Sequence, residues 1–233
     1  MTEFAYDLFL ILHILGFVYW LGGDVGVFYS SGFVIDPKYS AETRLVASKI
    51  MMDLDLIPRI CMTLMLTIGG TLASMQGVDH YPGQMLALWI LAPAWLFMVV
   101  YMHFRHGNPL AKKLGAVDTW LRRILIGGIA VSVIYTLYTG RLSDTPWLTA
   151  KVGLFGILIL CGVMIRKYLP DYIAGIQALA KGSITSEENI KMAAGLKSAK
   201  PWVLTIWGIV FLEAVLGITK PGNELTLNFA GLL

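Results

Sequence analysis

The stretch that decides the fold is residues 6–34, YDLFLILHILGFVYWLGGDVGVFYSSGFV, in which the only acidic or basic side chains are Asp7, His13 and Asp24. A helix needs about 20 consecutive, mostly apolar residues to cross a bilayer. This stretch is long enough, so it predicts a membrane-spanning helix. No basic cluster precedes it and no small-residue cleavage site follows, so we expect a retained span rather than a cleaved signal peptide.

Five further apolar stretches lie downstream of this one. Hydrophobic residues make up 57% of the 233 residues and charged residues 14%, and the mean hydropathy is +0.70. Such a composition excludes an ordinary soluble domain. We expect an all-α, polytopic bundle of about six transmembrane helices in one domain, residues 1–233, with the lipid bilayer as its main partner and no nucleic acid. The remaining spans are predicted at 58–75, 83–103, 120–140, 146–166 and 201–219.

Lysine and arginine are distributed unevenly between the two sides of this predicted bundle. Fifteen of them lie in or beside the connections 36–57, 104–119 and 167–200, whereas the opposite side holds only Arg141 and Lys220. Cytoplasmic loops carry the excess of these residues. The distribution therefore predicts that both termini lie on the outer side, which is the periplasm if the protein belongs to a bacterial inner membrane.

Three ionisable residues are expected at matching depth in the outer half of the membrane. Given a rise of about 1.5 Å per residue, His13, Lys151 and Glu213 lie roughly 8–10 Å below the outer ends of their helices. Ionisable groups inside a membrane usually have a function or a partner. The layer is therefore a candidate site, and the alternative is a self-neutralising Lys151–Glu213 ion pair with His13 bonded to a backbone carbonyl.

Other polar residues favour structural interpretations. We expect an ion pair between Asp24 and Arg59, close helix approach at Gly22-Gly23, Gly26 and Gly69-Gly70, and a surface position for His80. His103 and His106 share a helix face and can bind a metal or a heme edge, but ordinary interfacial roles are favoured. Thr185 or Ser186 is expected to cap a short surface helix. Cys61 and Cys161 lie in apolar segments and predict no disulfide or structural zinc.

Depth also limits how a heme could be held. His13 and His103 differ by roughly 20 Å in depth, so they cannot be the two axial ligands of one heme. A heme on His13 would take its second ligand from Met85, His80 or Lys151, or stay five-coordinate.

Several short motifs, taken in order, resemble those of known membrane families. The two motifs within residues 12–23 are similar to the opening helix of HemJ-type protoporphyrinogen oxidases and CopD-like proteins. The motifs that follow resemble later stretches of these families or of related uncharacterised predicted integral membrane proteins. The chain differs in having an extra pair of helices between the matching regions. The motifs are Leu12-His13-Ile14-Leu15-Gly16, Trp20-Leu21-Gly22-Gly23, Arg59-Ile60-Cys61-Met62-Thr63, Thr139-Gly140-Arg141, Trp147-Leu148-Thr149-Ala150-Lys151 and Thr219-Lys220-Pro221.

The resemblance implies a heme b site in which His13 is the iron ligand and Lys151 is a functional lysine, holding a heme propionate or a substrate carboxylate. Together with the layer of ionisable residues it suggests that Lys151 and Glu213 are catalytic in a heme-dependent membrane oxidoreductase of the electron-transport type. A quinone or a porphyrinogen-like molecule is the expected substrate, and a homo-oligomer or a partner membrane subunit is compatible with the sequence. The alternatives are a CopD-like copper transport or resistance protein and a non-catalytic subunit of a larger complex.

Overall fold

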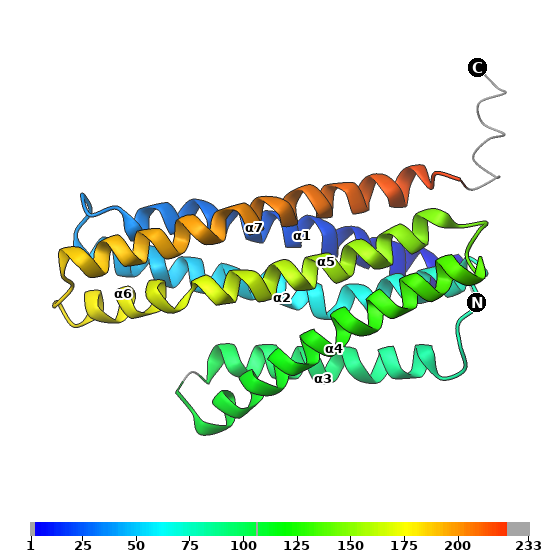
Figure 1. Cartoon of the computed structure of the whole chain (residues 1–233), viewed down its shortest axis with the longest axis horizontal. Helices are drawn as coiled ribbons and strands as arrows, with labels where there is room; N and C mark the ends of the chain where they lie inside the picture. Colours follow the sequence, from blue (N-terminus) through cyan, green and yellow to red (C-terminus); the bar gives the residue numbers. More distant parts are fainter. Residues whose placement is uncertain (1–2, 106, 223–233) are drawn as a thin grey trace, which may run out of the picture. The chain divides into compact units, whose positions relative to one another are not determined.

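A computed structural model describes residues 3–105 and 107–222 of the chain (Figure 1). All the regular secondary structure in these ranges is α-helical, which confirms the predicted fold class. Every helix except α6 is long and apolar enough to cross a membrane, so the chain is a multi-pass membrane protein with six candidate spans. The helices are α1 (Glu3–Ile35), α2 (Ala41–Met75), α3 (Gln84–Phe104), α4 (Pro109–Thr139), α5 (Pro146–Tyr168), α6 (Pro170–Ala180) and α7 (Ser186–Thr219).

Three helices begin well before the predicted spans. The sequence predicted spans that start near Pro58, Trp120 and Pro201, but α2, α4 and α7 begin earlier, at Ala41, Pro109 and Ser186, within the polar connections that precede these residues. Pro58 and Pro201 consequently lie inside helices, where each removes one backbone hydrogen bond. The predicted starts were wrong because the polar segments carry capping signals of their own.

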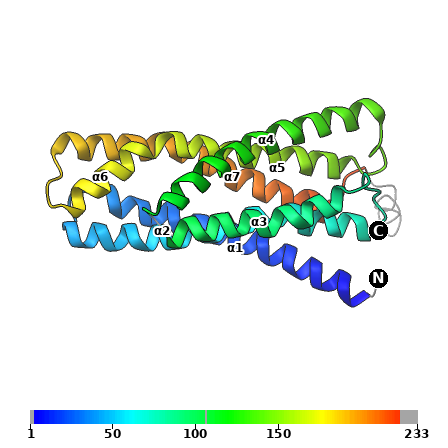
Figure 2. The same ribbon diagram turned by 90° about the horizontal axis from the view of Figure 1, so that it is seen from below.

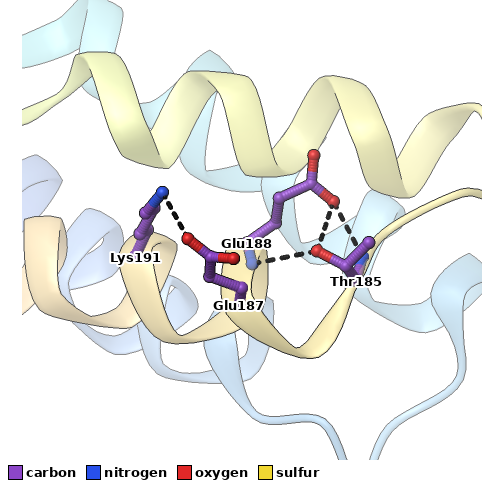
Figure 3. A network of polar contacts seen from close by, with 4 residues as sticks. All are labelled: Thr185, Glu187, Glu188 and Lys191. Atoms are coloured by element: carbon purple, nitrogen blue, oxygen red, sulfur yellow. Dashed lines mark hydrogen bonds and ion pairs between the residues drawn. The ribbon is translucent and has the colours of Figure 1, made fainter.

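The start of α7 shows such a signal (Figure 3). The backbone N–H of Thr185 donates to Oε2 of Glu188 at 2.7 Å, and the N–H of Glu188 donates back to Oγ1 of Thr185 at 3.2 Å. This reciprocal pair is a capping box, and an ion pair between Lys191 and Glu187 at 2.7 Å follows one turn later. Capping by Thr185 is confirmed, but the helix it caps is not short, because it continues to Thr219.

The described residues group into two compact units. The first comprises those up to Asp118 and from Ile173 to Ala193, and the second comprises those from Thr119 to Tyr172 and from Ala194 onward. The single transmembrane domain and the outward termini stay predictions.

In the first unit, α2 packs against both α1 and α3 (Figure 2). Glycines of α1 lie directly against α2: a Cβ on Gly23 would lie 2.8 Å from Cδ of Pro58, and one on Gly26 would lie 2.8 Å from Cδ1 of Leu54. Gly22 has nothing within 4 Å. Close approach at Gly23 and Gly26 is therefore confirmed, whereas Gly22 takes no part in it.

In the second unit, α5 and α7 run in opposite directions, as the colours in Figure 1 show. A Cβ on Gly156 of α5 would lie 2.9 Å from Cγ2 of Ile129 in α4, so a glycine sets this helix spacing as well. The outward side of α4 carries the exposed residues Val131, Ile134 and Leu137. Exposed aliphatic side chains in the apolar C-terminal third of such a helix are suited to contact with lipid.

Candidate functional site

His13 projects from α1 onto the backbone of α2. A Cβ on Gly69 would lie 3.4 Å from Cε1 and 3.9 Å from Nδ1 of the imidazole. The ring is half-buried, and it occupies the space that a side chain at residue 69 would otherwise fill. A glycine at position 69 therefore makes room for the imidazole of His13.

Side chains from a later part of the chain lie against the neighbouring glycine, Gly70. A Cβ on Gly70 would lie 3.5 Å from Sδ of Met85 and 3.2 Å from Cδ1 of Leu88. His80, whose ring nitrogen Nε2 lies 3.1 Å from the Gly70 carbonyl oxygen, is half-buried rather than a freely exposed surface residue. Three side chains able to bind iron, those of His13, His80 and Met85, thus gather at one pair of glycines.

Lys151 and Glu213 meet between α5 and α7 in the second unit. Nζ of Lys151 lies 3.5 Å from Oε2 of Glu213, and it also donates to the backbone carbonyl of Glu213 at 3.0 Å. The two side chains are only 16% and 17% exposed. A Cβ on Gly217 would lie 3.0 Å from Nζ, so this glycine leaves space for the ammonium group. The ion pair suggested by helix depth is formed, and the catalytic roles of its members stay predictions.

Two buried polar atoms near this pair have no hydrogen-bond partner among the described residues. One is Oε1 of Glu213, the second oxygen of the paired carboxylate, and the other is Nε1 of Trp147. Trp147 lies one turn before Lys151 on α5 and is 7% exposed. Nζ of Lys220 lies 5.5 Å from the centroid of its indole ring. Because indoles are common in apolar helices, this N–H could not be singled out from the sequence.

The predicted layer of three residues is therefore distributed over two units. The structure brings Lys151 and Glu213 together in the second unit, and it places His13 in the first. His13 and the Lys151–Glu213 pair therefore belong to two separate local sites.

The predicted pair between Asp24 and Arg59 is not formed. Nη2 of Arg59 bonds instead to Oδ2 of Asp55, one turn earlier on the same helix. The prediction was wrong because it placed Arg59 at the start of a helix, whereas α2 begins at Ala41 and brings Asp55 within reach at i,i+4. Oδ2 of Asp24 is buried without a hydrogen-bond partner among the described residues.

His103 contacts an acidic and an aromatic side chain, and its interfacial position stays a prediction. Its Nε2 lies 3.7 Å from Oδ1 of Asp53, and its ring packs edge-on against Phe104. His106, the second member of the predicted histidine pair, lies outside the described residues. Among the residues that the structure describes, no group of three or more histidine, cysteine, aspartate or glutamate side chains is placed to hold a metal ion.

Two buried polar anchors escaped the sequence analysis. Asp118 is fully buried in the first unit and accepts a 2.6 Å hydrogen bond from Nε1 of Trp95. Arg44 is 4% exposed and donates to the carbonyl of Val34 and to Oδ1 of Asn189, both at 2.7 Å. Both residues were assigned to polar connections from the sequence. The signals that were missed were the starts of α2 at Ala41 and of α4 at Pro109, because both residue types favour a first helical turn.

Comparisons with known proteins assign no family to this arrangement. No protein-family model, curated protein or solved structure matches the chain.

Proposed function

We propose that the chain is an integral membrane redox protein that binds heme b, with His13 as an axial ligand of the iron. The observation that supports this proposal most directly is the position of the imidazole at Gly69, where no Cβ competes for the space. A neutral imidazole is a common axial ligand of heme iron, and a methionine thioether is a frequent second one.

The residues around His13 suit such a group chemically. Gly69 and Gly70 leave the surface of α2 without side chains, and Sδ of Met85 lies beside Gly70. Met85 is therefore the preferred second ligand, and His80 the alternative, since its ring already contacts the Gly70 carbonyl. A bound heme would supply one-electron chemistry, while the residues of the chain hold it and keep water away.

Lys151 and Glu213 are proposed to act on the substrate side of this reaction. Paired ionisable residues at membrane depth are uncommon without a role, and the family resemblance implies a functional lysine at position 151. The substrate would be a membrane quinone or a porphyrinogen-like molecule, which makes the chain a heme-dependent oxidoreductase.

Absorption spectra of the purified protein with and without dithionite test the proposal. The wild-type protein should show a Soret band that shifts on reduction. His13→Ala should lose most of the bound heme while still inserting into the membrane, and His103→Ala is the matched control that should retain it. Normal heme content in His13→Ala would refute the assignment of the ligand, and a wild-type protein without a Soret band after expression with ample heme would refute the function.

A further inference from the structure

The outer part of the α5–α7 contact carries more polar groups than an ion pair requires. We propose that Trp147, Lys151 and Glu213 bind the headgroup of a membrane hydroquinone. The inference rests on the proposed function for its biological meaning, because a hydroquinone would be the electron donor to the heme. Its physical basis, however, lies entirely within the second unit.

The Lys151–Glu213 pair favours a neutral ligand. Its two charges cancel each other at 3.5 Å, and a second ammonium hydrogen is taken by the backbone carbonyl of Glu213 at 3.0 Å. A further cation, Nζ of Lys220, lies 5.5 Å from the centroid of the Trp147 ring. A carboxylate ligand would have to compete with Glu213 for the lysine and would be repelled by it. A neutral hydroxyl group meets neither difficulty, so a hydroquinone fits better than an anionic substrate.

The two unsatisfied atoms have complementary polarity. Nε1 of Trp147 is a donor without an acceptor, and Oε1 of Glu213 is an acceptor without a donor. A buried polar group without a partner is unfavourable, and a ligand that supplies the partner gains that free energy. A hydroquinone carries hydroxyl groups on opposite edges of its ring, so one can accept from the indole while the other donates to the carboxylate.

Two of these residues share one face of α5. Trp147 and Lys151 are four residues apart, with a rise of about 6 Å between them along the helix. The indole therefore lies on the same face of α5 as the ion pair. Gly217 faces Lys151 from α7, and its missing side chain leaves room for the ammonium group.

The helix that carries Glu213 borders lipid. On α7, Phe211 and Ile218 are 64% and 82% exposed, and large apolar side chains exposed on a membrane helix face hydrocarbon. A lipophilic ring with an isoprenoid tail is therefore better matched to these surroundings than a water-soluble molecule.

Calorimetric titration of the protein in lipid nanodiscs with decylubiquinol tests the inference, with empty nanodiscs as the blank for lipid partitioning. Trp147→Phe removes the N–H but leaves the ion pair intact, and it should weaken binding about fivefold, as expected for one neutral hydrogen bond. Glu213→Gln should weaken binding about tenfold or more, because a bond to a charged acceptor is lost. The matched control is Trp120→Phe, at an exposed indole of α4, which should bind as the wild type does.

Unchanged affinity in Trp147→Phe, or no saturable binding above that of empty nanodiscs, would overturn the inference and would leave a bridging water as the partner of these atoms. The heme-deficient His13→Ala variant separates the two proposals. If it binds decylubiquinol normally, the quinol site stands by itself whatever becomes of the heme. If the wild type contains heme but does not bind the quinol, the inference fails and the proposed function survives.

Discussion

Glu213 and Asp24 are both acidic residues within membrane helices, and the structure treats them differently. Glu213 meets Lys151 across the α5–α7 contact. Asp24 lacks its expected partner, because Arg59 bonds to Asp55 of the same helix, and Oδ2 of Asp24 is buried without a hydrogen-bond partner among the described residues. The comparison teaches that a basic residue at matching depth is not sufficient for a buried carboxylate to form an ion pair with it. Local i,i+4 geometry within one helix decides first which carboxylate it neutralises.

The prediction with the largest expected effect concerns the orientation of the chain, which decides the side of the membrane that lies nearer to each of these two acidic residues. A reporter that is active only in the cytoplasm should be silent after Leu233 and active within residues 181–200. This follows from the uneven distribution of lysine and arginine. Reporter activity in the reverse pattern would place the Lys151–Glu213 pair near the cytoplasmic face instead of the outer one.

Breaking the Lys151–Glu213 pair should be the most damaging substitution. Lys151→Met alone is expected to reduce the free energy of unfolding by about 3–5 kcal/mol, because a buried carboxylate is left without its counter-charge. The double variant Lys151→Met with Glu213→Gln should recover most of that stability. Unfolding in detergent, followed by circular dichroism, measures both values.

The same double variant also distinguishes a structural pair from a functional one. We expect its oxidoreductase activity to remain as low as that of Lys151→Met alone, since the proposal gives Lys151 a role beyond neutralising Glu213. Full recovery of activity together with stability would show that the lysine is only structural.

Glycine substitutions in α1 provide a smaller effect with a matched control. Gly23→Ala should cost about 1–3 kcal/mol of unfolding free energy, because its Cβ would meet the Pro58 ring at 2.8 Å. Gly22→Ala, in open space, should be neutral or stabilising by up to about 1 kcal/mol, since alanine favours a helix more than glycine does. Equal destabilisation by both would contradict the α1–α2 packing.

The smallest effect is expected at Asp24. Asp24→Asn should change the free energy of unfolding by less than about 1 kcal/mol or stabilise the protein, because it removes a buried carboxylate whose Oδ2 has no hydrogen-bond partner among the described residues and breaks no ion pair. A loss comparable to that of Lys151→Met would indicate that Asp24 has a cationic partner after all. The same unfolding measurement decides this point.

Much of the fold follows from the sequence by itself. Hydrophobicity and length are local properties of a segment, so six spans could be recognised without knowledge of their neighbours. Depth along a helix is also local, because the rise per residue is constant, and it correctly suggested that Lys151 and Glu213 could pair. Close helix approach in this glycine-rich part of α1 was likewise predictable from residue size, although which glycines make the contact was not.

Partner choice and the true helix starts required the tertiary structure. Asp118 was assigned to a polar connection, yet it is fully buried against Trp95, because burial depends on which helices pack together. Gly22 and Gly23 are indistinguishable in sequence, and only the orientation of α1 toward α2 decides that one is at the contact and the other is open. The packing of α5 and α7 likewise decides that the indole N–H of Trp147 and one carboxylate oxygen of Glu213 are unsatisfied. Whether a polar atom has a hydrogen-bond partner depends on its three-dimensional surroundings.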